Sequence, residues 1–594
     1  MRTLFYLIFF VLSFQLMAED ITIIELHEND NIDQGLIEAA QENNNEDGTI
    51  EEDKSFSNEE IQIEGSLLND EESVPEDINI EEISIKKNNE IYSLPTPWEN
   101  SSKEDLFFLF DKINLSNSIV LNKLLIQFLE SDSKPKNITK DDFNHLKIKN
   151  LIKLQQTEIS FKLINLFENK KNIDFYNLFK LNYSFLKYDL IEACDFNNTI
   201  ERKTTKIDPN FLLKVDIFCT YIKGEVEEAN FLNSLLLDAN DKDTYFQELY
   251  WKLQNSDKNE IDITSFNYLS DSMTLYSAMI RVGDIPLTEI FLDHDTSNLS
   301  LPIILSKSSN ISLRLKAAHA AYKKQMFSSE SLAALYQTVD FSYDELSNSN
   351  SSFDSLEMNM AYLFQKANIQ LLPITRLESL IDFWIYAENN QLNLLAYDIS
   401  RNLIDNIEPS AELYEYGLEI VKAHIYNKNF EQANKWLLFT ENYISNQEGV
   451  DQRIKSVKLL YNLNNPLDES QFIDILIQSD LFNQEYKDGL RQDILLTILS
   501  VIDDEHEVKF FENKNFIDKR SMPSRYLLDK IYLSSKLNNI GELLLYINIS
   551  IQNKSWIDIH PAHLKVILNA IKNTISNDIF NNLIVEILQE SKII

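Results

Sequence analysis

The stretch YNKNFEQA, residues 426–433, decides the fold of this chain. A helical pattern of apolar residues ends there on three polar ones, Asn427 to Asn429. Phe430 opens a second apolar pattern, and the small residue Ala433 follows three positions later. Short polar turns join antiparallel helices, and a small residue in the second helix lets the two backbones approach closely. The stretch therefore predicts a helical hairpin.

Breaks of the same form recur and extend this prediction along the chain. The further breaks are KGEV at 223–226, VGDI at 282–285, NNQL at 389–392 and NNIG at 538–541. The turns near residues 390 and 428 lie about 38 positions apart, close to the period of paired-helix repeats. Between breaks, apolar residues recur at i, i+3, i+4 and i+7, as over residues 413–425. We therefore predict an all-α chain, an α-solenoid of stacked antiparallel helix pairs over residues 93–594.

Glycine is scarce, with 9 residues in 594, whereas an average usage of about 7% would give about 40. Glycine permits positive φ and close backbone approach to ligands. The scarcity therefore weighs against glycine-built phosphate loops, dinucleotide-binding turns and the nucleophile elbow of hydrolases. Gly224, Gly283 and Gly541 fall at predicted hairpin turns. Gly417 falls inside a helical pattern, where we expect close packing against a neighbouring helix.

The N-terminus has the features of a secretory signal peptide over residues 1–18. Arg2 precedes the apolar run LFYLIFFVLSFQLM at 4–17, and Ala18 comes before an acidic segment. An uncleaved anchor is the alternative, but the run is short for a membrane span of about 20 residues. We expect an exported protein, periplasmic or secreted, whose mature chain has no integral membrane segment.

Residues 19–92 form an acidic segment, with 24 aspartates and glutamates against three lysines. Its apolar content is too low to offset the entropy of ordering, so we predict disorder. Two short apolar islands, 21–26 and 78–85, are candidates to dock on a partner or on the folded body. The formal net charge of the whole chain, −40, argues against nucleic-acid binding, which requires clustered lysine and arginine.

Cys194 and Cys219 are the two cysteines of the chain. In an oxidising compartment the pair favours a disulfide, which would close a loop of about 25 residues and stabilise the fold by on the order of 3 kcal/mol. Two buried free thiols on neighbouring helices are the alternative. We expect no redox-active pair, because the Cys-x-x-Cys spacing is missing.

The stretch at 426–433 resembles the centre of a tetratricopeptide repeat, in which an aromatic-Glu-x-Ala step opens the second helix. Residues 221–229 resemble the same step less closely. This resemblance covers about 20 to 30 residues and implies a repeat solenoid. Residues 332–336 and 339–346, with the helices that follow, are similar to long exported helical proteins of alphaproteobacteria. That similarity implies export and a helical architecture, and it carries over no functional residues.

The dipeptide Glu330-Ser331 matches the catalytic step of exported lytic transglycosylases that carry a helical superhelix. The glycine-rich segment expected downstream in such enzymes is missing from this sequence. We interpret Ser328 or Ser329 instead as the N-cap of a helix that begins beside Glu330. The dipeptide is therefore a weak catalytic candidate.

The sequence has few patterns that are typical of metal ligands. His560 and His563 flank Pro561 at a spacing that suits a ligand pair, although a proline there more simply marks a helix start. We interpret the acidic run 503–507 as a solvated loop and the run 293–295 as a turn. We predict no catalytic, cofactor-binding or metal-binding residue. Three tryptophans are expected in the core, unless one lines a groove, and they are Trp251, Trp384 and Trp436.

Stacked helix pairs expose an extended concave surface that commonly serves binding. We therefore expect an exported scaffold or adaptor that binds a protein or peptide partner in the cell envelope. An envelope enzyme that acts on peptidoglycan is one alternative, and a purely structural envelope component is another.

Overall fold

A computed structural model gives the structure of the chain. It describes residues 96–166, 171–259, 272–293, 298–324, 326–347, 353–390, 392–444, 451–465, 471–479, 489–502, 520 and 522–593. The predicted signal peptide at 1–18, the acidic segment at 19–92 and the acidic run at 503–507 lie outside the described residues. The described residues all fall within one compact unit.

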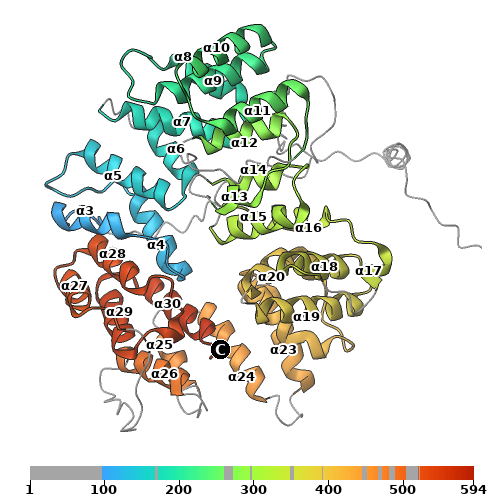
Figure 1. Ribbon diagram of the computed structural model, residues 1–594. Helices are drawn as coiled ribbons and strands as arrows, with labels where there is room; N and C mark the ends of the chain where they lie inside the picture. The colour runs from blue at the N-terminus through green and yellow to red at the C-terminus, as the bar shows by residue number, and fades with distance from the viewer. Residues whose placement is uncertain are drawn as a thin grey trace, which may run out of the picture. The chain divides into compact units, whose positions relative to one another are not determined.

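Every regular element of the described residues is a helix (Figure 1). The first helices are α3 (Lys103–Lys112), α4 (Ile119–Glu130), α5 (Lys140–Lys153), α6 (Thr157–Leu166), α7 (Ile173–Lys187), α8 (Leu190–Thr199), α9 (Pro209–Ile222), α10 (Val226–Asp238), α11 (Thr244–Asn255), α12 (Met273–Val282), α13 (Glu289–Asp293), α14 (Ser300–Leu305) and α15 (Ile311–Lys323). The next are α16 (Ser329–Gln337), α17 (Tyr343–Ser347), α18 (Leu356–Asn368), α19 (Pro373–Asn389), α20 (Asn393–Ile399), α21 (Arg401–Ile404), η3 (Tyr414–Tyr416), α22 (Gly417–Tyr426), α23 (Phe430–Ile444) and α24 (Asp451–Asn464). The last are α25 (Gln471–Gln478), α26 (Gly489–Ile502), α27 (Arg525–Lys536), α28 (Ile540–Ile551), η5 (Trp556–Asp558), α29 (Pro561–Thr574) and α30 (Asn577–Glu590). None of the helices in these ranges has the length and apolar character that crossing a bilayer requires.

Neighbouring helices pack as antiparallel pairs, and the pairs stack in chain order (Figure 1). α9 packs with α10, α18 with α19, and α22 with α23. α22 also contacts α20 before it and α24 after it, so each pair buries a face of the next. The prediction of an all-α solenoid of stacked helix pairs is confirmed.

The hairpin that decides the fold forms as predicted. α22 ends at Tyr426 and α23 begins at Phe430. The side-chain amide of Asn427 donates to the carbonyl oxygen of Tyr397 on α20 at 3.0 Å, which fastens the turn to the preceding helix. Ala433 is fully buried, as a small residue in the seam of a helix pair should be.

Three glycines have the positions that the sequence predicts: Gly224 and Gly283 at turns, and Gly417 inside a helix. Gly224 follows α9 with φ of +84°, a backbone conformation that other residues rarely adopt. Gly283 follows α12 directly as its C-cap residue. At Gly417, an added Cβ would lie 2.0 Å from Oγ1 of Thr440 on the partner helix α23. The expected close packing of Gly417 against a neighbouring helix is confirmed.

The buried apolar residues form two large clusters. One runs from Leu181 on α7 to Leu460 on α24. The other combines residues of α3 to α6 with residues of α24 to α30. Because α3 contacts α28, and α4 contacts both α28 and α30, the first described helices share a core with the last ones.

Gly541 lies at this contact, and its predicted role as a turn residue is wrong. It is the second residue of α28 and it packs against the ring of Trp98. An added Cβ would lie 2.4 Å from Cε3 of that ring. The backbone N–H of Gly541 donates to the carbonyl oxygen of Pro97 at 2.8 Å. Glycine is needed here for close approach between the two ends of the helical array.

Candidate functional site

Two carboxylates from the last helices cap the first ones. Glu542 on α28 accepts a hydrogen bond from the backbone N–H of Ser102, at the start of α3. Glu586 on α30 accepts one from the backbone N–H of Val120, at the start of α4, at 2.8 Å. The N-terminus of a helix has unpaired backbone N–H groups and a partial positive charge. A carboxylate there accepts hydrogen bonds from these N–H groups and is attracted by the charge. The two caps fix where the first helices meet the last ones.

Burial sets the protonation of these two carboxyls. It raises the pKa of Glu586, and hydrogen bonds from Ser118, Val120 and Trp556 oppose the rise. The indole N–H of Trp556 donates to Oε1 of Glu586 at 2.9 Å. Burial likewise raises the pKa of Glu542. Both caps therefore hold their protons more tightly than exposed glutamates do.

A lysine from α27 completes the contact with α3. Lys530 Nζ lies 3.2 Å from Oδ2 of Asp105. The same ammonium lies 5.7 Å from the ring centres of Tyr526 and Tyr546, within the range of cation–π attraction. Burial alone would lower the pKa of Lys530, but the hydrogen bond to Asp105 holds it above its ordinary value.

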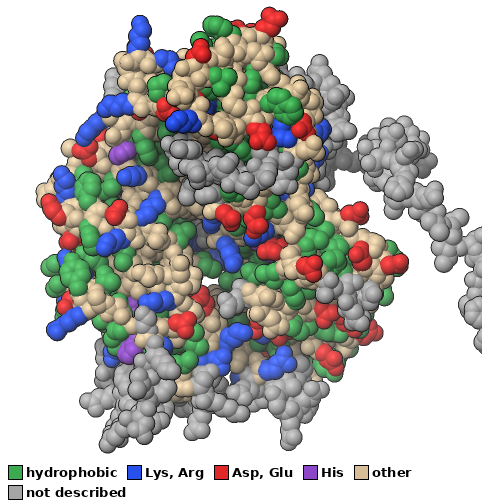
Figure 2. Space-filling view, viewed as in Figure 1, with side chains coloured by type: hydrophobic (Ala, Val, Ile, Leu, Met, Phe, Trp, Pro, Cys, Tyr) green, Lys and Arg blue, Asp and Glu red, His purple; other side chains and the backbone are tan. Residues whose placement is uncertain are grey.

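Exposed apolar side chains flank this ion pair on both helices. Phe108 lies one helical turn after Asp105, and Tyr526, Leu533 and Leu537 form a stripe along α27 with spacings of seven and four residues. Four such side chains, each between 49% and 65% exposed, define what we name the junction face: Phe108, Tyr526, Leu533 and Leu537. Figure 2 shows hydrophobic side chains at the surface where Figure 1 places α3 and α27. α27 thus carries apolar residues on its outer side as well as on the side that faces the core.

A small cavity of about 50 Å³ lies elsewhere, among α6, α7, α14, α15 and the turn that precedes α16. Tyr183 donates a hydrogen bond to Glu158 in its wall, and Lys187 Nζ lies 3.5 Å from Oε2 of the same carboxylate. Burial alone would raise the pKa of Glu158, but the bond from Tyr183 and the charge of Lys187 hold it below its ordinary value. The cavity has room for only one or two water molecules. It is a weaker candidate than the junction face.

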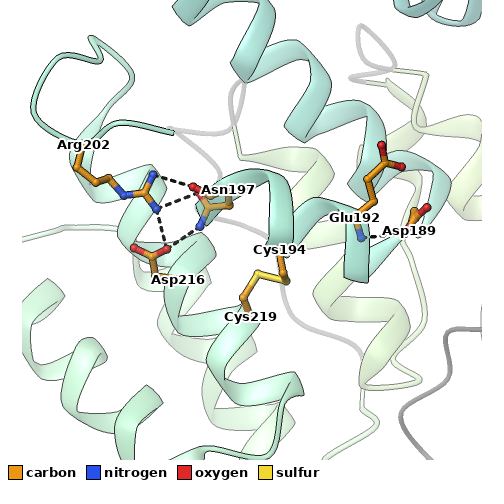
Figure 3. Close-up of a disulfide and its surroundings, with 7 residues drawn as sticks. All are labelled: Asp189, Glu192, Cys194, Asn197, Arg202, Asp216 and Cys219. Carbon is orange, nitrogen blue, oxygen red and sulfur yellow. Dashed lines mark hydrogen bonds and ion pairs between the residues drawn. A yellow bond between two sulfur atoms is a disulfide. The ribbon is translucent and has the colours of Figure 1, made fainter. Parts of the chain in front are cut away.

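The structure joins Cys194 on α8 to Cys219 on α9 in a disulfide (Figure 3). Their Cα atoms lie 5.6 Å apart, and both residues are buried. Beside them, Oδ1 of Asp216 accepts hydrogen bonds from Arg202 at 2.7 Å and from Asn197 at 2.6 Å. One covalent and one polar link therefore fasten α8 to α9. Cys194 and Cys219, the two predicted site residues, therefore have a structural role. They belong to other helices than the junction face does.

The catalytic candidate Glu330-Ser331 lies in the first turn of α16. Ser328 is the N-cap of this helix, and its hydroxyl accepts the backbone N–H of Ser331 at 3.1 Å. The N-cap interpretation is confirmed. The dipeptide belongs to the start of a helix and carries no proposal of catalysis.

The two histidines of the metal candidate have separate roles. His560 is the N-cap of α29, and its Nδ1 accepts the backbone N–H of Ala562 at 3.1 Å. His563 lies inside the helix, 2.8 Å from the hydroxyl of Ser550. Within the described ranges, no three His, Cys, Asp or Glu residues are placed to hold a metal ion together.

Three histidines are buried, and burial lowers the pKa of each to about 4. They are His319, His424 and His563. We refer to them below as the three buried histidines. They remain neutral at physiological pH and become relevant only in acid.

The tryptophans divide between core and surface. Trp384 and Trp436 are buried, as expected for aromatics between stacked helices. Trp251 on α11 is 54% exposed. The core position is therefore wrong for Trp251, which lies on the outer side of α11.

Sequence analysis did not identify Glu542, Glu586 or the junction face. A signal was present, because each glutamate is the one acid in a strongly apolar stretch, IGELLLY at 540–546 and LIVEILQ at 583–589. Such a residue is rarely buried unless it is paired. The sequence does not reveal that the partners are helix N-termini more than 400 residues away.

Comparison of the chain with protein-family models, curated proteins and solved structures finds no match. The resemblance to a tetratricopeptide repeat and the similarity to exported alphaproteobacterial proteins therefore stay predictions from the sequence.

Proposed function

We propose that this protein is an exported helical scaffold that binds a protein or peptide partner in the cell envelope. The observation that carries the proposal is the junction face, where aromatic and aliphatic side chains are exposed around a single ion pair. Aromatic anchors around a few fixed polar groups are typical of protein interfaces.

The rigidity of the junction supports this proposal. Lys530 is held by Asp105, and the start of α3 is capped by Glu542, so the exposed rings stand on helices that these contacts join. A preorganised surface loses less entropy on binding than a flexible one. The junction face therefore suits a partner with an apolar helix or loop of its own.

Export is supported by two features of different kinds. The apolar run at 4–17 has the length and flanks of a signal peptide. The Cys194–Cys219 disulfide belongs to a class of bond that persists mainly in oxidising compartments. Fractionation of the source cells, with thiol labelling before and after reduction, tests this part. Recovery of the protein in the cytoplasm with free thiols would contradict export.

Partner binding is tested by cross-linking capture with the full chain. The junction variant combines Phe108→Ser, Leu533→Ser and Leu537→Ser. The matched control removes three exposed apolar side chains elsewhere, Phe231, Leu235 and Leu371, by the same change to serine. Surface changes of this kind usually alter stability by less than about 0.5 kcal/mol each, so both variants should fold.

We expect one partner to be captured by the wild type and by the control, and to be lost from the junction variant. Equal capture by both variants would refute the junction face as the binding site. Failure of the wild type to capture any partner from envelope extracts would refute the proposed function itself.

A further inference from the structure

The region around α5 is basic in an otherwise acidic chain. Residues 131–187 contain 11 lysines against six acidic residues, whereas the chain as a whole has a net charge of −40. Figure 2 shows Lys and Arg side chains gathered over the part where Figure 1 places α5 and its neighbours. This basic surface is distinct from the junction face and is not used by the proposed function.

Within this surface, some lysines are neutralised by local carboxylates and others are not. Lys140 lies 3.3 Å from Asp132, and Lys171 lies 2.7 Å from Asp142. Four other exposed lysines have no carboxylate within ion-pair distance among the described residues. We name these four the lysine face: Lys134, Lys136, Lys149 and Lys153.

The lysine face comprises two lysines of the α4–α5 loop and two in the C-terminal half of α5. Lys149 and Lys153 are one helical turn apart on α5, whose 14 residues span about 21 Å. Among the residues that the structure describes, Lys134 donates to the carbonyl oxygens of Pro135 and Ile138, and Lys153 donates to that of Asp111 on α3. Ammonium groups that no carboxylate neutralises attract an extended anionic segment.

The first described residues of the chain contact the loop of this face. The backbone N–H of Trp98 donates to the hydroxyl of Ser133 at 3.0 Å, in the loop that also carries Lys134 and Lys136. The described chain therefore begins within a few residues of the lysine face. Everything upstream of residue 96 is tethered at this point.

The nearest dense acidic stretch has the charge and the reach to cover the lysine face. Residues 70–82, DEESVPEDINIEE, contain seven acidic residues and no basic one. The 14 residues that separate Glu82 from Thr96 reach at most about 50 Å, more than twice the length of α5. A tether of this length gives an effective concentration of the order of millimolar. Ion pairs that are individually weak then act together.

We infer that residues 70–82 bind to the lysine face of the same chain. The occupant is this chain's own acidic segment, held by several exposed ion pairs and released by salt. The lysine face is consequently covered at low ionic strength and opens to other anionic partners when the segment leaves.

Electron–electron distance measurement on the full chain tests this inference. Spin labels are attached at Ser73→Cys and Asn137→Cys, and the native cysteines stay unlabelled because they are joined in a disulfide. Distances are measured at about 0.01 M and about 1 M salt, where the Debye length is about 30 Å and about 3 Å. We expect a short-distance population that falls at least about threefold at high salt.

Two charge variants make the result specific. Changing Lys134, Lys136, Lys149 and Lys153 to glutamine should remove the short-distance population at low salt. The matched control makes the same change at four exposed lysines outside the lysine face, and should retain it: Lys203, Lys206, Lys223 and Lys242. Both variants lose the same charge, so only position distinguishes them.

A third variant changes Asp70 to Asn and both Glu71 and Glu72 to Gln, all outside the described residues. It should weaken the short-distance population. A distance distribution that is the same at both salt concentrations would overturn the inference, as would equal loss in the two lysine variants. Short distances between singly labelled copies, mixed in one sample, would overturn binding within one chain and identify the occupant as a second copy. None of these outcomes depends on the junction face.

Discussion

Replacing Gly541 by alanine tests whether the two ends of the helical array share one core. The new Cβ would lie 2.4 Å from Cε3 of Trp98 and 2.7 Å from the carbonyl oxygen of Pro97. Trp98 is fully buried, and its indole N–H donates to the carbonyl oxygen of Phe128 at 2.8 Å, so the ring is held in place. Overpacking costs about 1–3 kcal/mol, and the better helix propensity of alanine offsets up to about 1 kcal/mol. We expect a net destabilisation of about 1–2 kcal/mol.

The assay is hydrogen exchange of the full chain, followed by mass spectrometry of peptides from α3, α28 and α18. A solenoid loses stability locally, so the effect should be confined to the helices that meet at Gly541. A change of 1–2 kcal/mol corresponds to exchange that is about 5–30 times faster in α3 and α28. Peptides from α18 should be unchanged.

Gly489→Ala is the matched control, because an added Cβ there has no neighbour within 4 Å. It should leave exchange in α3 and α28 unchanged or slightly slower. If Gly541→Ala also leaves these helices unchanged, or if both variants have equal effects, the close packing of α28 on Trp98 is refuted.

Three further predictions concern stability. Lys214 Nζ lies 2.8 Å from Asp241 and 2.7 Å from Asp243 in a buried cluster, so Lys214→Met should lower the free energy of unfolding by about 3–5 kcal/mol in urea denaturation. A loss below about 1 kcal/mol would show that the cluster is solvated. The three buried histidines have a pKa near 6.5 when unfolded and about 4 when folded, so the unfolded chain binds more protons between these values. Stability should fall as pH drops from 6.5 to 4, by on the order of 2–3 kcal/mol per histidine, and a flat profile in pH-dependent melting would contradict this. Replacing both Cys194 and Cys219 by alanine should lower stability by about 3 kcal/mol, and a melting temperature equal to that of the oxidised wild type would argue that the disulfide is absent.

The two capping glutamates, Glu542 and Glu586, change the stability of the fold with pH in the direction opposite to the three buried histidines. Burial raises the pKa of Glu542 and Glu586, so the folded chain holds their protons to higher pH than the unfolded chain does. Their contribution to stability is therefore present at low pH and is lost as pH rises through the raised values. Glu586→Gln should remove part of the stability that the glutamates contribute at low pH. The free energy of unfolding of this variant should therefore fall more steeply as the pH is lowered.

The local part of the fold was predictable because its determinants are adjacent in sequence. The polar turn before Phe430 and the small residue Ala433 sufficed to place a helix boundary and a hairpin. The N-cap at Ser328 was predictable for the same reason, since it depends on a few neighbouring residues.

The contact between the first and last helices was not predictable, because its determinants are far apart. Gly541 has the pattern of a turn residue, and only its approach to Trp98 explains it. Glu542 and Glu586 stand out in the sequence as acids within apolar stretches. The neighbouring sequence does not indicate that Ser102 and Val120 are their partners. Exposure likewise depends on packing, so the aromatic residues of the junction face could not be separated from those of the core by spacing alone.

The contact of α3 with the last helices, through its packing on α28 and its ion pair with α27, is tested most directly by zero-length carbodiimide cross-linking of the unmodified full chain. Lys530 and Asp105 lie 3.2 Å apart, and Lys458 and Glu441, which are 2.9 Å apart between α23 and α24, provide the positive control. Mixed unlabelled and ¹⁵N-labelled chains distinguish links within one chain from links between chains. We predict a Lys530–Asp105 amide within one chain, at a yield comparable to that of the control pair. A sample in which Lys458 and Glu441 are linked, while Lys530 and Asp105 are unlinked or linked only between chains, would contradict the shared core.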